Sequence, residues 1–245
     1  KMKKTLYLIC ILLITEVSYS QQFLGSVIAG ANISQVDGDE VYGFRKAGIH
    51  AGAAVSLPLD KKHHWTATIE LLYSQKGSYR KYYVSNMCDS CPPDLNINKE
   101  VPCNSKIKYK LQLDYVEIPL TVHYEDFRTG WSIGAGAAWG RLVNVKEIEN
   151  GWTRTTSIRS KIYSRNEWSI LADVKIRIWK GLKFDIRYQY TIAPIRTRDF
   201  YVGTPKQETR KQYNNVITCR LIYVFNEKFQ KNDKGKWEKT IKSKK

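Results

Sequence analysis

The sequence has no apolar run long enough to cross a bilayer as a helix. A membrane-spanning helix needs roughly 20 consecutive apolar residues, and the apolar run near the N-terminus, Leu6 to Ile14, has only about nine. Farther along the chain, Gly, Ser, Asp or Lys interrupts the apolar stretches at nearly every second position. These interruptions exclude a helical inner-membrane protein but are compatible with strands that cross a membrane.

Cysteine and histidine are scarce, at five and four residues. Cys88, Cys91 and Cys103 lie in one segment, where CxxC suggests either a redox pair or half of a zinc site. A zinc site needs four ligands, and no histidine lies nearby. For an exported chain we therefore expect an oxidised loop, in which one of the three cysteines is unpaired unless it bonds a partner protein. We predict no metal and no cofactor, and expect Cys219 to face lipid and to be inert.

The lack of histidine also bears on enzymatic activity. The four long segments that connect the predicted strands, 34–45, 77–108, 144–167 and 193–214, contain no histidine. A surface protease with an Asp–His pair, or a lipid deacylase with Ser and His, would need one there. We therefore predict that the protein is not an enzyme, with an outer-membrane lipid or peptide hydrolase as an alternative.

The N-terminal segment has the features of a secretory signal peptide. Lys3 and Lys4 precede the apolar run, and Ser18-Tyr19-Ser20 provides the small residues that a signal peptidase reads. We expect cleavage after Ser20, so that residues 1–20 are removed.

The chain is strongly basic, with a formal net charge of +17. Removal of the signal peptide, which carries three lysines and one glutamate, leaves +15. Such an excess often indicates a nucleic-acid partner, but an exported protein seldom meets nucleic acid. We therefore expect no nucleic acid, and favour lipid phosphates, acidic glycans or acidic proteins as partners.

Apolar and polar residues alternate in eight segments of the length that a transmembrane strand requires, about 9–11 residues. The segments are 23–33, 46–57, 65–76, 109–124, 131–143, 168–178, 182–192 and 215–225. In 109–124 the alternation changes phase at Tyr115-Val116. This predicts a β-bulge that keeps Leu111, Leu113 and Tyr115 on the lipid face, with Pro119 on the lumen face.

Two further patterns favour a membrane barrel over a soluble β-sandwich, which would also alternate. Aromatic residues, such as Trp65, Trp131 and Tyr223, fall at the ends of the apolar faces, as in the girdles of outer-membrane barrels. The connections alternate between long and short, as an even number of strands with both termini in the periplasm requires. The sequence therefore predicts an all-β, eight-stranded antiparallel up-and-down transmembrane β-barrel over 21–225, followed by a basic periplasmic tail at 226–245.

Several stretches resemble the Bacteroidota outer-membrane β-barrels of the PorT family. They are Ile28–Asp39, Lys46–Gly52, Leu71–Ser78, Leu113–Leu120 and the final Tyr223–Phe225. The resemblance implies an outer-membrane barrel of about eight strands. It also implies a link to the secretion and gliding machinery of that phylum (type IX secretion), although most members have no assigned activity.

The lumen of an eight-stranded barrel is just wide enough to be filled by side chains. The alternation places charged residues of both signs on the lumen face, and the principal ones are Glu70, Asp114, Glu117, Asp173, Lys175, Arg177, Asp185, Arg187 and Arg220. We interpret them as a structural network of ion pairs, with a narrow gated pore or a proton path as the alternative. A passive pore for nutrients is not expected, since water-filled porins use about 16–18 strands.

Basic residues in two long connections are candidates for contact with anionic lipid. Segments 146–166 and 193–213 each carry a net charge of +3, interspersed with aromatic residues. The candidates are Arg154, Arg159, Lys161, Arg165, Arg196, Arg198, Arg210 and Lys211. They would bind the phosphates of lipopolysaccharide, or would simply form a solvated loop surface.

The expected function is that of a non-enzymatic structural or interaction subunit of the cell outer membrane. It would act in a secretion (type IX-like) or envelope assembly, through its extracellular loops or its tail. The tail has a net charge of +5, and either docks an acidic periplasmic partner or is disordered. A small channel or transport accessory is the first alternative.

Overall fold

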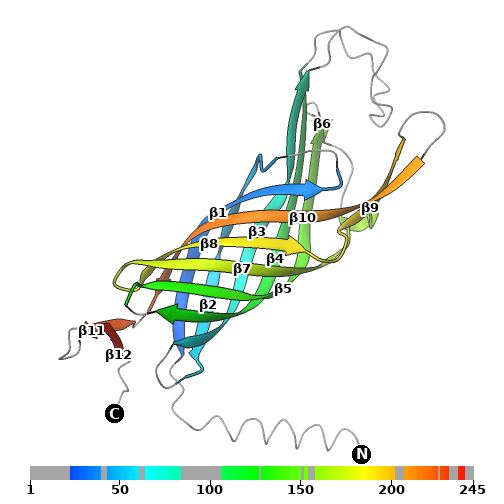
Figure 1. Cartoon of the computed structure of the whole chain (residues 1–245). Coiled ribbons are helices and arrows are strands. Elements are labelled where there is room, and N and C mark those ends of the chain that lie inside the picture. Colours follow the sequence, from blue (N-terminus) through cyan, green and yellow to red (C-terminus); the bar gives the residue numbers. More distant parts are fainter. Residues whose placement is uncertain are drawn as a thin grey trace, which may run out of the picture.

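Eight long antiparallel strands form a closed ring in the computed structural model of the chain (Figure 1). The structure describes residues 23–39, 43–60, 64–83, 106–126, 128–149, 152–153, 158–201, 207–225, 227–231 and 237–240. The ring strands are β1 (Leu24–Asp37), β2 (Lys46–Pro58), β3 (Trp65–Tyr83), β4 (Lys106–Asp126), β5 (Trp131–Glu149), β7 (Asn166–Trp179), β8 (Leu182–Thr191) and β10 (Gln207–Val224).

Each ring strand pairs with the ring strand that precedes it in the chain, and β1 pairs with β10 to close the barrel. The closing pairs run from Ser26 opposite Val224 to Asp37 opposite Tyr213. This order confirms the predicted eight-stranded up-and-down barrel, because every predicted segment overlaps one ring strand.

Short elements lie outside the ring. Strand β6 (Trp152–Thr153) pairs with β5, and β9 (Arg196–Tyr201) pairs with the first part of β10. A 3-10 turn, η2, covers Ile158–Ser160. In the tail, β11 (Lys228–Lys231) and β12 (Trp237–Thr240) form a separate antiparallel hairpin.

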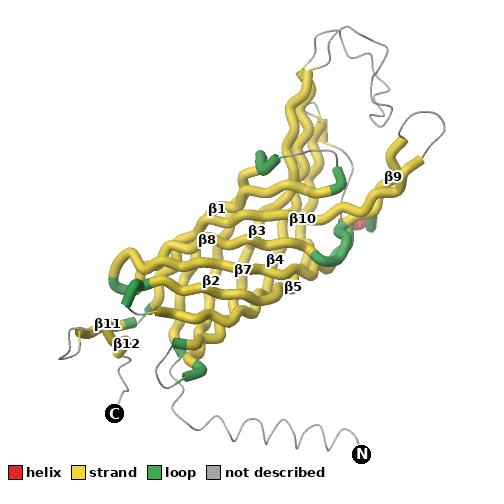
Figure 2. Tube along the Cα trace, in the orientation of Figure 1, coloured by secondary structure: helices red, strands yellow, loops and turns green. Residues whose placement is uncertain are grey.

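The barrel has a long-loop end and a short-turn end. The long-loop end has the four longer connections between ring strands, which are 38–45, 84–105, 150–165 and 192–206. The short-turn end has the three shorter connections, 59–64, 127–130 and 180–181, together with the start of β1 and the end of β10. Strands β3, β4 and β5 and the β9–β10 hairpin extend beyond the rest of the ring at the long-loop end (Figure 2). The predicted strands stop short of these extensions, because their alternation continues with polar rather than apolar residues.

The predicted bulge at Tyr115-Val116 is wrong. Residues Leu111, Leu113 and Tyr115 are at most 2% exposed and point into the lumen, so β4 alternates without a break. The register shift lies in the partner strand β5, where Asp114 pairs with Asn144 and Tyr115 with Leu142. The extra residue in β5 is an ordinary β-bulge.

Pro119 faces the lumen, as expected, and interrupts one ladder. The pairing of β3 with β4 lapses between Ile69 opposite Leu120 and Leu72 opposite Glu117, then resumes in the same register. Proline has no N–H to donate to the ladder, which accounts for the gap without any shift of the strands.

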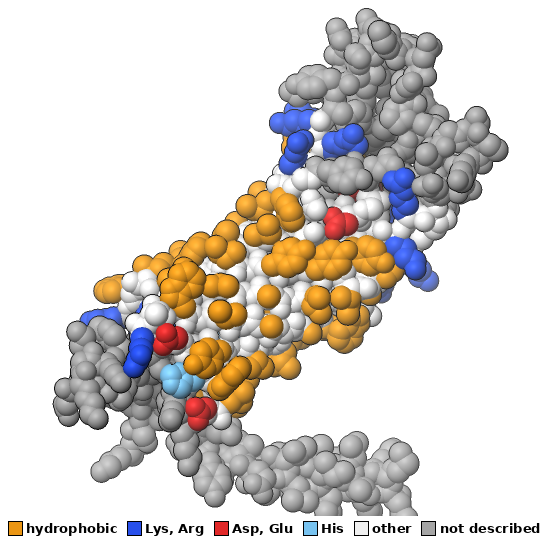
Figure 3. Space-filling view, in the orientation of Figure 1, with side chains coloured by type: hydrophobic (Ala, Val, Ile, Leu, Met, Phe, Trp, Pro, Cys, Tyr) orange, Lys and Arg blue, Asp and Glu red, His pale blue; other side chains and the backbone are white. Residues whose placement is uncertain are grey.

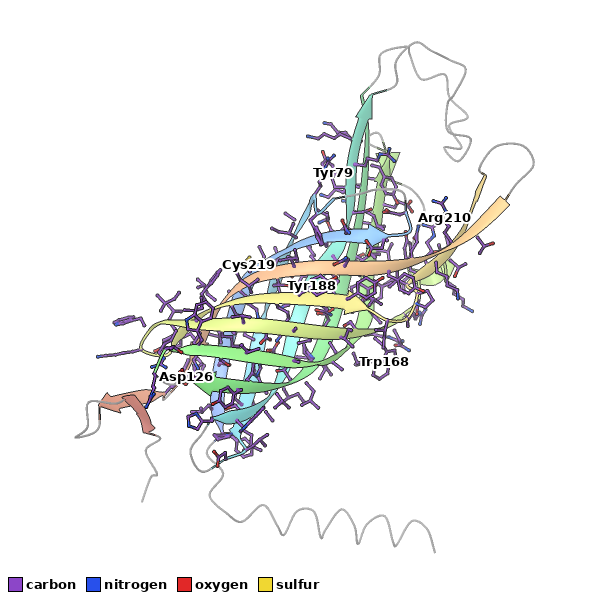
Figure 4. All side chains as sticks on the ribbon, in the orientation of Figure 1. Tyr79, Asp126, Trp168, Tyr188, Arg210 and Cys219 are labelled. Carbon is purple, nitrogen blue, oxygen red and sulfur yellow. The ribbon has the colours of Figure 1, made fainter. Side chains whose placement is uncertain are left out.

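The outer surface of the ring is a band of exposed apolar side chains (Figure 3). Ile133, Leu71 and Leu120 within it are 58–65% exposed. Aromatic residues mark its two edges: Trp65 packs against Tyr124 at the short-turn end, and Trp168 projects outward near the long-loop end (Figure 4). Among the described residues, no helix is long and apolar enough to span a membrane.

Lumen-facing glycines in β5 differ in how closely a neighbouring backbone approaches them. A Cβ on Gly136 would lie 2.0 Å from the carbonyl oxygen of Leu120, whereas a Cβ on Gly140 would meet nothing closer than 3.4 Å, at the flexible side chain of Glu117. Of these two positions, only Gly136 therefore requires glycine for strand packing.

We predict that Gly136→Ala folds less completely than Gly140→Ala, because overpacking costs about 1–3 kcal/mol. The folded fraction is measured as the band that shifts on heating before electrophoresis, since closed barrels resist detergent when cold. Equal folded fractions for the two variants would contradict the packing described for β5, and an unshifted wild-type band would contradict the closed barrel.

Candidate functional site in the lumen and at the two ends

Five charged residues meet in the middle of the lumen and form what we call the central cluster: Glu70, Asp173, Asp185, Arg187 and Arg220. Glu70 accepts two hydrogen bonds from Arg187, at 2.8 and 2.9 Å, and two from Arg220, at 2.8 and 3.2 Å. Arg187 also binds Asp173 at 2.7 Å, and Arg220 binds Asp185. All five side chains are at most 1% exposed. Carboxylates and guanidiniums thus pair with one another away from bulk solvent.

A histidine and a lysine extend the central cluster. His123 Nε2 lies 2.9 Å from Asp173 Oδ1 and 2.7 Å from Lys175 Nζ. Because the same nitrogen faces an acceptor and a cation, the roles of donor and acceptor depend on where the protons lie. Such an arrangement is suited to hold an exchangeable proton.

A second group lies on the long-loop side of the central cluster and has Lys76 at its centre. Lys76 pairs with Glu117 and, at 2.7 Å, with Glu167. Glu167 also accepts hydrogen bonds from Thr191 and Asn214, at 2.9 and 2.8 Å. These bonds join β3, β4, β7, β8 and β10 across the lumen.

An apolar plug closes the lumen above Lys76 at the long-loop end. Its buried members are Val36, Leu111, Leu113, Tyr115, Leu142, Val145, Tyr163 and Ile195. Tyr163 and Ile195 come from the connections rather than from ring strands, and are held there by backbone hydrogen bonds from Ser164 to Ile195 and from Ile195 to Gln212. The described parts of two connections, around Tyr163 and Ile195, therefore fold inward and help to fill this end of the lumen.

A third group lies at the short-turn end. Lys183 donates to Glu125 at 2.9 Å and to Glu227 at 3.1 Å. Glu227 follows the last ring strand, so this contact fixes the root of the tail to the barrel. Beside it a cavity of about 40 Å³, room for a few water molecules, reaches as far as Glu70 and Lys175.

Two residues predicted in the lumen network lie apart from the central cluster and the groups that adjoin it. Asp114 is on the outer face of β4, where it accepts hydrogen bonds from Asn144 at 2.9 Å and Gln112 at 3.2 Å. It faces outward because β4 has no bulge and its odd-numbered residues point inward. Arg177 lies opposite Lys183 and so on the lumen face, as predicted, but at the short-turn end, where it is half-buried beside Gly130 and the register of β7 with β8 shifts. The structure brings the other seven together in the central cluster and the groups that adjoin it.

The candidate lipid contacts lie at the long-loop end where the structure describes them. Lys161, Arg165 and Lys211 are exposed, and Figure 4 shows Arg210 on the extension of β10. Arg196 instead supports the plug, because it donates to the Tyr163 hydroxyl at 2.8 Å and lies 5.0 Å from the centre of that ring. Arg154 and the side chains of Arg159 and Arg198 lie outside the described residues.

The predicted cysteine loop, with Cys88, Cys91 and Cys103, also lies outside the described residues, so its pairing stays a prediction. Cys219 is a free thiol on an outward position of β10 (Figure 4). In the part of the chain that the structure describes, no group of His, Cys, Asp and Glu is arranged to hold a metal ion.

Sequence reasoning missed Glu125, Glu167 and Glu227 as lumen residues. The alternation of the 168–178 segment, extended back by one residue, would have placed Glu167 with Asp173 on the inner face. Glu125 would have followed in the same way from 109–124. Glu227 carries no such signal, because it lies beyond the last strand.

An eight-stranded antiparallel ring with an apolar outer band and a polar, filled lumen defines a membrane β-barrel. The chain belongs to the family described as outer membrane protein beta-barrel domain, which it matches over residues 19–196. It is therefore an outer-membrane protein.

Solved structures similar to this chain include two bacterial outer-membrane proteins. Ail, the attachment invasion locus protein of Yersinia pestis, is 11% identical with a TM-score of 0.42, over 83% of this chain and 99% of Ail. Neisserial surface protein A is 9% identical with a TM-score of 0.41, over 82% of this chain and 95% of that protein. No curated protein matches the chain.

We predict that Glu70→Gln destabilises the barrel by about 3–5 kcal/mol, because it leaves two buried arginines without their shared carboxylate. The free energy of unfolding is measured by urea titration in lipid vesicles. Asp60→Asn, in the half-exposed turn between β2 and β3, makes the same chemical change and is expected to cost less than about 0.5 kcal/mol. Equal effects of the two substitutions would show that the central cluster does not stabilise the barrel.

Proposed function

We propose that this protein is a non-enzymatic interaction subunit of the outer membrane, in which the barrel is a scaffold and binding occurs at its two ends. The observation that carries the proposal is the filled lumen. The apolar plug lies over the Lys76 group, which lies over the central cluster, and each layer is buried. In the part of the chain that the structure describes, a solute would have to displace these layers to pass along the lumen.

The proposal places the long-loop end outside the cell and the short-turn end in the periplasm. Its support is the general architecture of bacterial barrels, in which periplasmic turns are short and extracellular loops are long. On this placement residues 1–20 are a cleaved signal peptide, and 226–245 are a periplasmic tail whose root is held by the contact between Lys183 and Glu227.

The two ends suit anionic partners. The mature chain carries an excess of positive charge, and basic side chains gather beyond the apolar band at the long-loop end (Figure 3). The tail is rich in lysine. Lipopolysaccharide outside and an acidic protein inside are the partners that this charge distribution favours.

The resemblance to PorT-like barrels supports a place in a secretion (type IX-like) or envelope assembly. A barrel without an open lumen suits such a role, because it can anchor partners on both sides of the membrane without leaking solutes. We include this assembly role in the proposal.

A narrow channel or transport accessory is the second candidate, and the cavity at the short-turn end favours it. That cavity reaches Glu70 and Lys175, next to the His123 nitrogen that faces both an acid and a lysine. For conduction, the plug at the other end would have to open.

We predict that truncation after Glu227 removes at least one protein that copurifies with the full chain in mild detergent. The reason is that the truncation deletes the lysines of the tail and keeps the Lys183 contact, so the barrel itself is unchanged. Full-length Glu227→Gln is the matched control, since it weakens the contact and keeps the tail. Identical sets of copurifying proteins from the truncated and full-length chains would sink the tail-docking part of the proposal.

A further inference from the structure

Four lysines share the outer face of the strand extensions at the long-loop end. In the register of β3 with β4, Lys81 lies opposite Lys108 and Tyr79 opposite Lys110. In the register of β4 with β5, Gln112 lies opposite Lys146. Residues that are directly paired, or two apart along a strand, point to the same face of a sheet. We call Lys81, Lys108, Lys110 and Lys146 the lysine face.

The burial of neighbouring residues shows that this face points outward. The intervening residues of β4, Leu111 and Leu113, are buried in the plug, and so is Val145 beside Lys146. Lys81, Lys108 and Lys146 are exposed, and Lys110 is half-buried. Figure 4 shows Tyr79 on this extended part of β3.

The lysine face lacks internal neutralisation. Among the described residues, none of its four ammonium groups forms an ion pair with a carboxylate. Asp114, an acid on the same face, is occupied by Asn144 and Gln112. Like charges directly opposite each other, as at Lys81 and Lys108, destabilise a strand pair, so an external anion would stabilise these extensions.

The position of the face identifies the anion. It continues the outer face of the same three strands that carries Leu71, Leu120 and Val143 in the apolar band. Lys146 follows Val143 by three residues, which is about 10 Å along a strand. Lipid molecules packed against this side of the barrel would therefore present their headgroups to the lysines.

We propose that the lysine face binds the phosphate groups of lipopolysaccharide in the outer leaflet. The inference rests on the proposed placement of the long-loop end outside the cell, and it adds residues that the loop charges alone did not indicate. The ring of Tyr79 helps to hold Lys81 on this face, because the Lys81 ammonium group lies 5.5 Å from the centre of that ring.

The test compares binding of purified barrels in detergent to phosphorylated and to dephosphorylated lipopolysaccharide. The test variant changes all four residues of the lysine face to Gln. The control changes Lys61, Lys62, Arg128 and Lys180, in the three connections of the short-turn end, to Gln, so both variants lose four charges and keep the tail. Each protein is first checked for folding by its mobility shift on heating. If the fourfold variant does not fold, a double variant, Lys81→Gln with Lys108→Gln, replaces it.

We expect the wild type and the control to bind phosphorylated lipopolysaccharide equally. The lysine-face variant should bind it at least about tenfold more weakly, because each lysine near an anionic surface contributes on the order of 1 kcal/mol. Binding by the wild type should also weaken as salt is raised. Undiminished binding by the variant, or equal binding of the dephosphorylated lipid by the wild type, would overturn the inference. Copurification of protein partners is measured separately. If the lipid-binding result fails while the protein partners are still recovered, the inference is overturned and the proposed function stands.

Discussion

The shared coordination of Glu70 by Arg187 and Arg220 is the interaction on which the interior depends. A barrel of eight strands leaves a lumen too narrow for bulk water, and its inward positions here are charged. Isolated charges in such a place would cost several kcal/mol each. Two guanidiniums that converge on one carboxylate, with Asp173 and Asp185 completing the set, join β3, β7, β8 and β10 across the lumen and fill the charged interior with paired groups.

This filling shapes what the protein can do. Above it, the plug draws Tyr163 and Ile195 inward and so orders the bases of two long connections. Below it, Lys183 holds the root of the tail. Under the proposed function, the surfaces at both ends are carried by a filled barrel, which suits a protein that binds partners better than one that conducts. The plug also sets the direction of the lysine face. Because Leu111 and Leu113 pack inward, the lysines that alternate with them on β4 point outward.

Much of the fold could be predicted from the sequence because few folds other than a membrane barrel combine period-two alternation with strands of membrane-spanning length. The members of the central cluster followed from the same alternation. The errors arose where apolar residues do not face lipid. Alternation cannot distinguish a row of apolar residues that faces lipid from one that fills the lumen, so the prediction put Leu111, Leu113 and Tyr115 on the outer face. As a consequence it put Asp114, which alternates with them, on the lumen face. Partners across the lumen, such as Glu70 with Arg187 and Arg220, depend on the register of distant strands, which no local pattern encodes.

In the proposed function the lumen is closed and the protein binds its partners at its two ends. Single-channel recording of the purified full-length barrel in planar bilayers tests this most directly. The account predicts current at the background of the protein-free membrane, over the range of voltages at which the bilayer is stable. Discrete, reproducible conductance steps from the wild-type protein would contradict it and would make the layers of the lumen a gate.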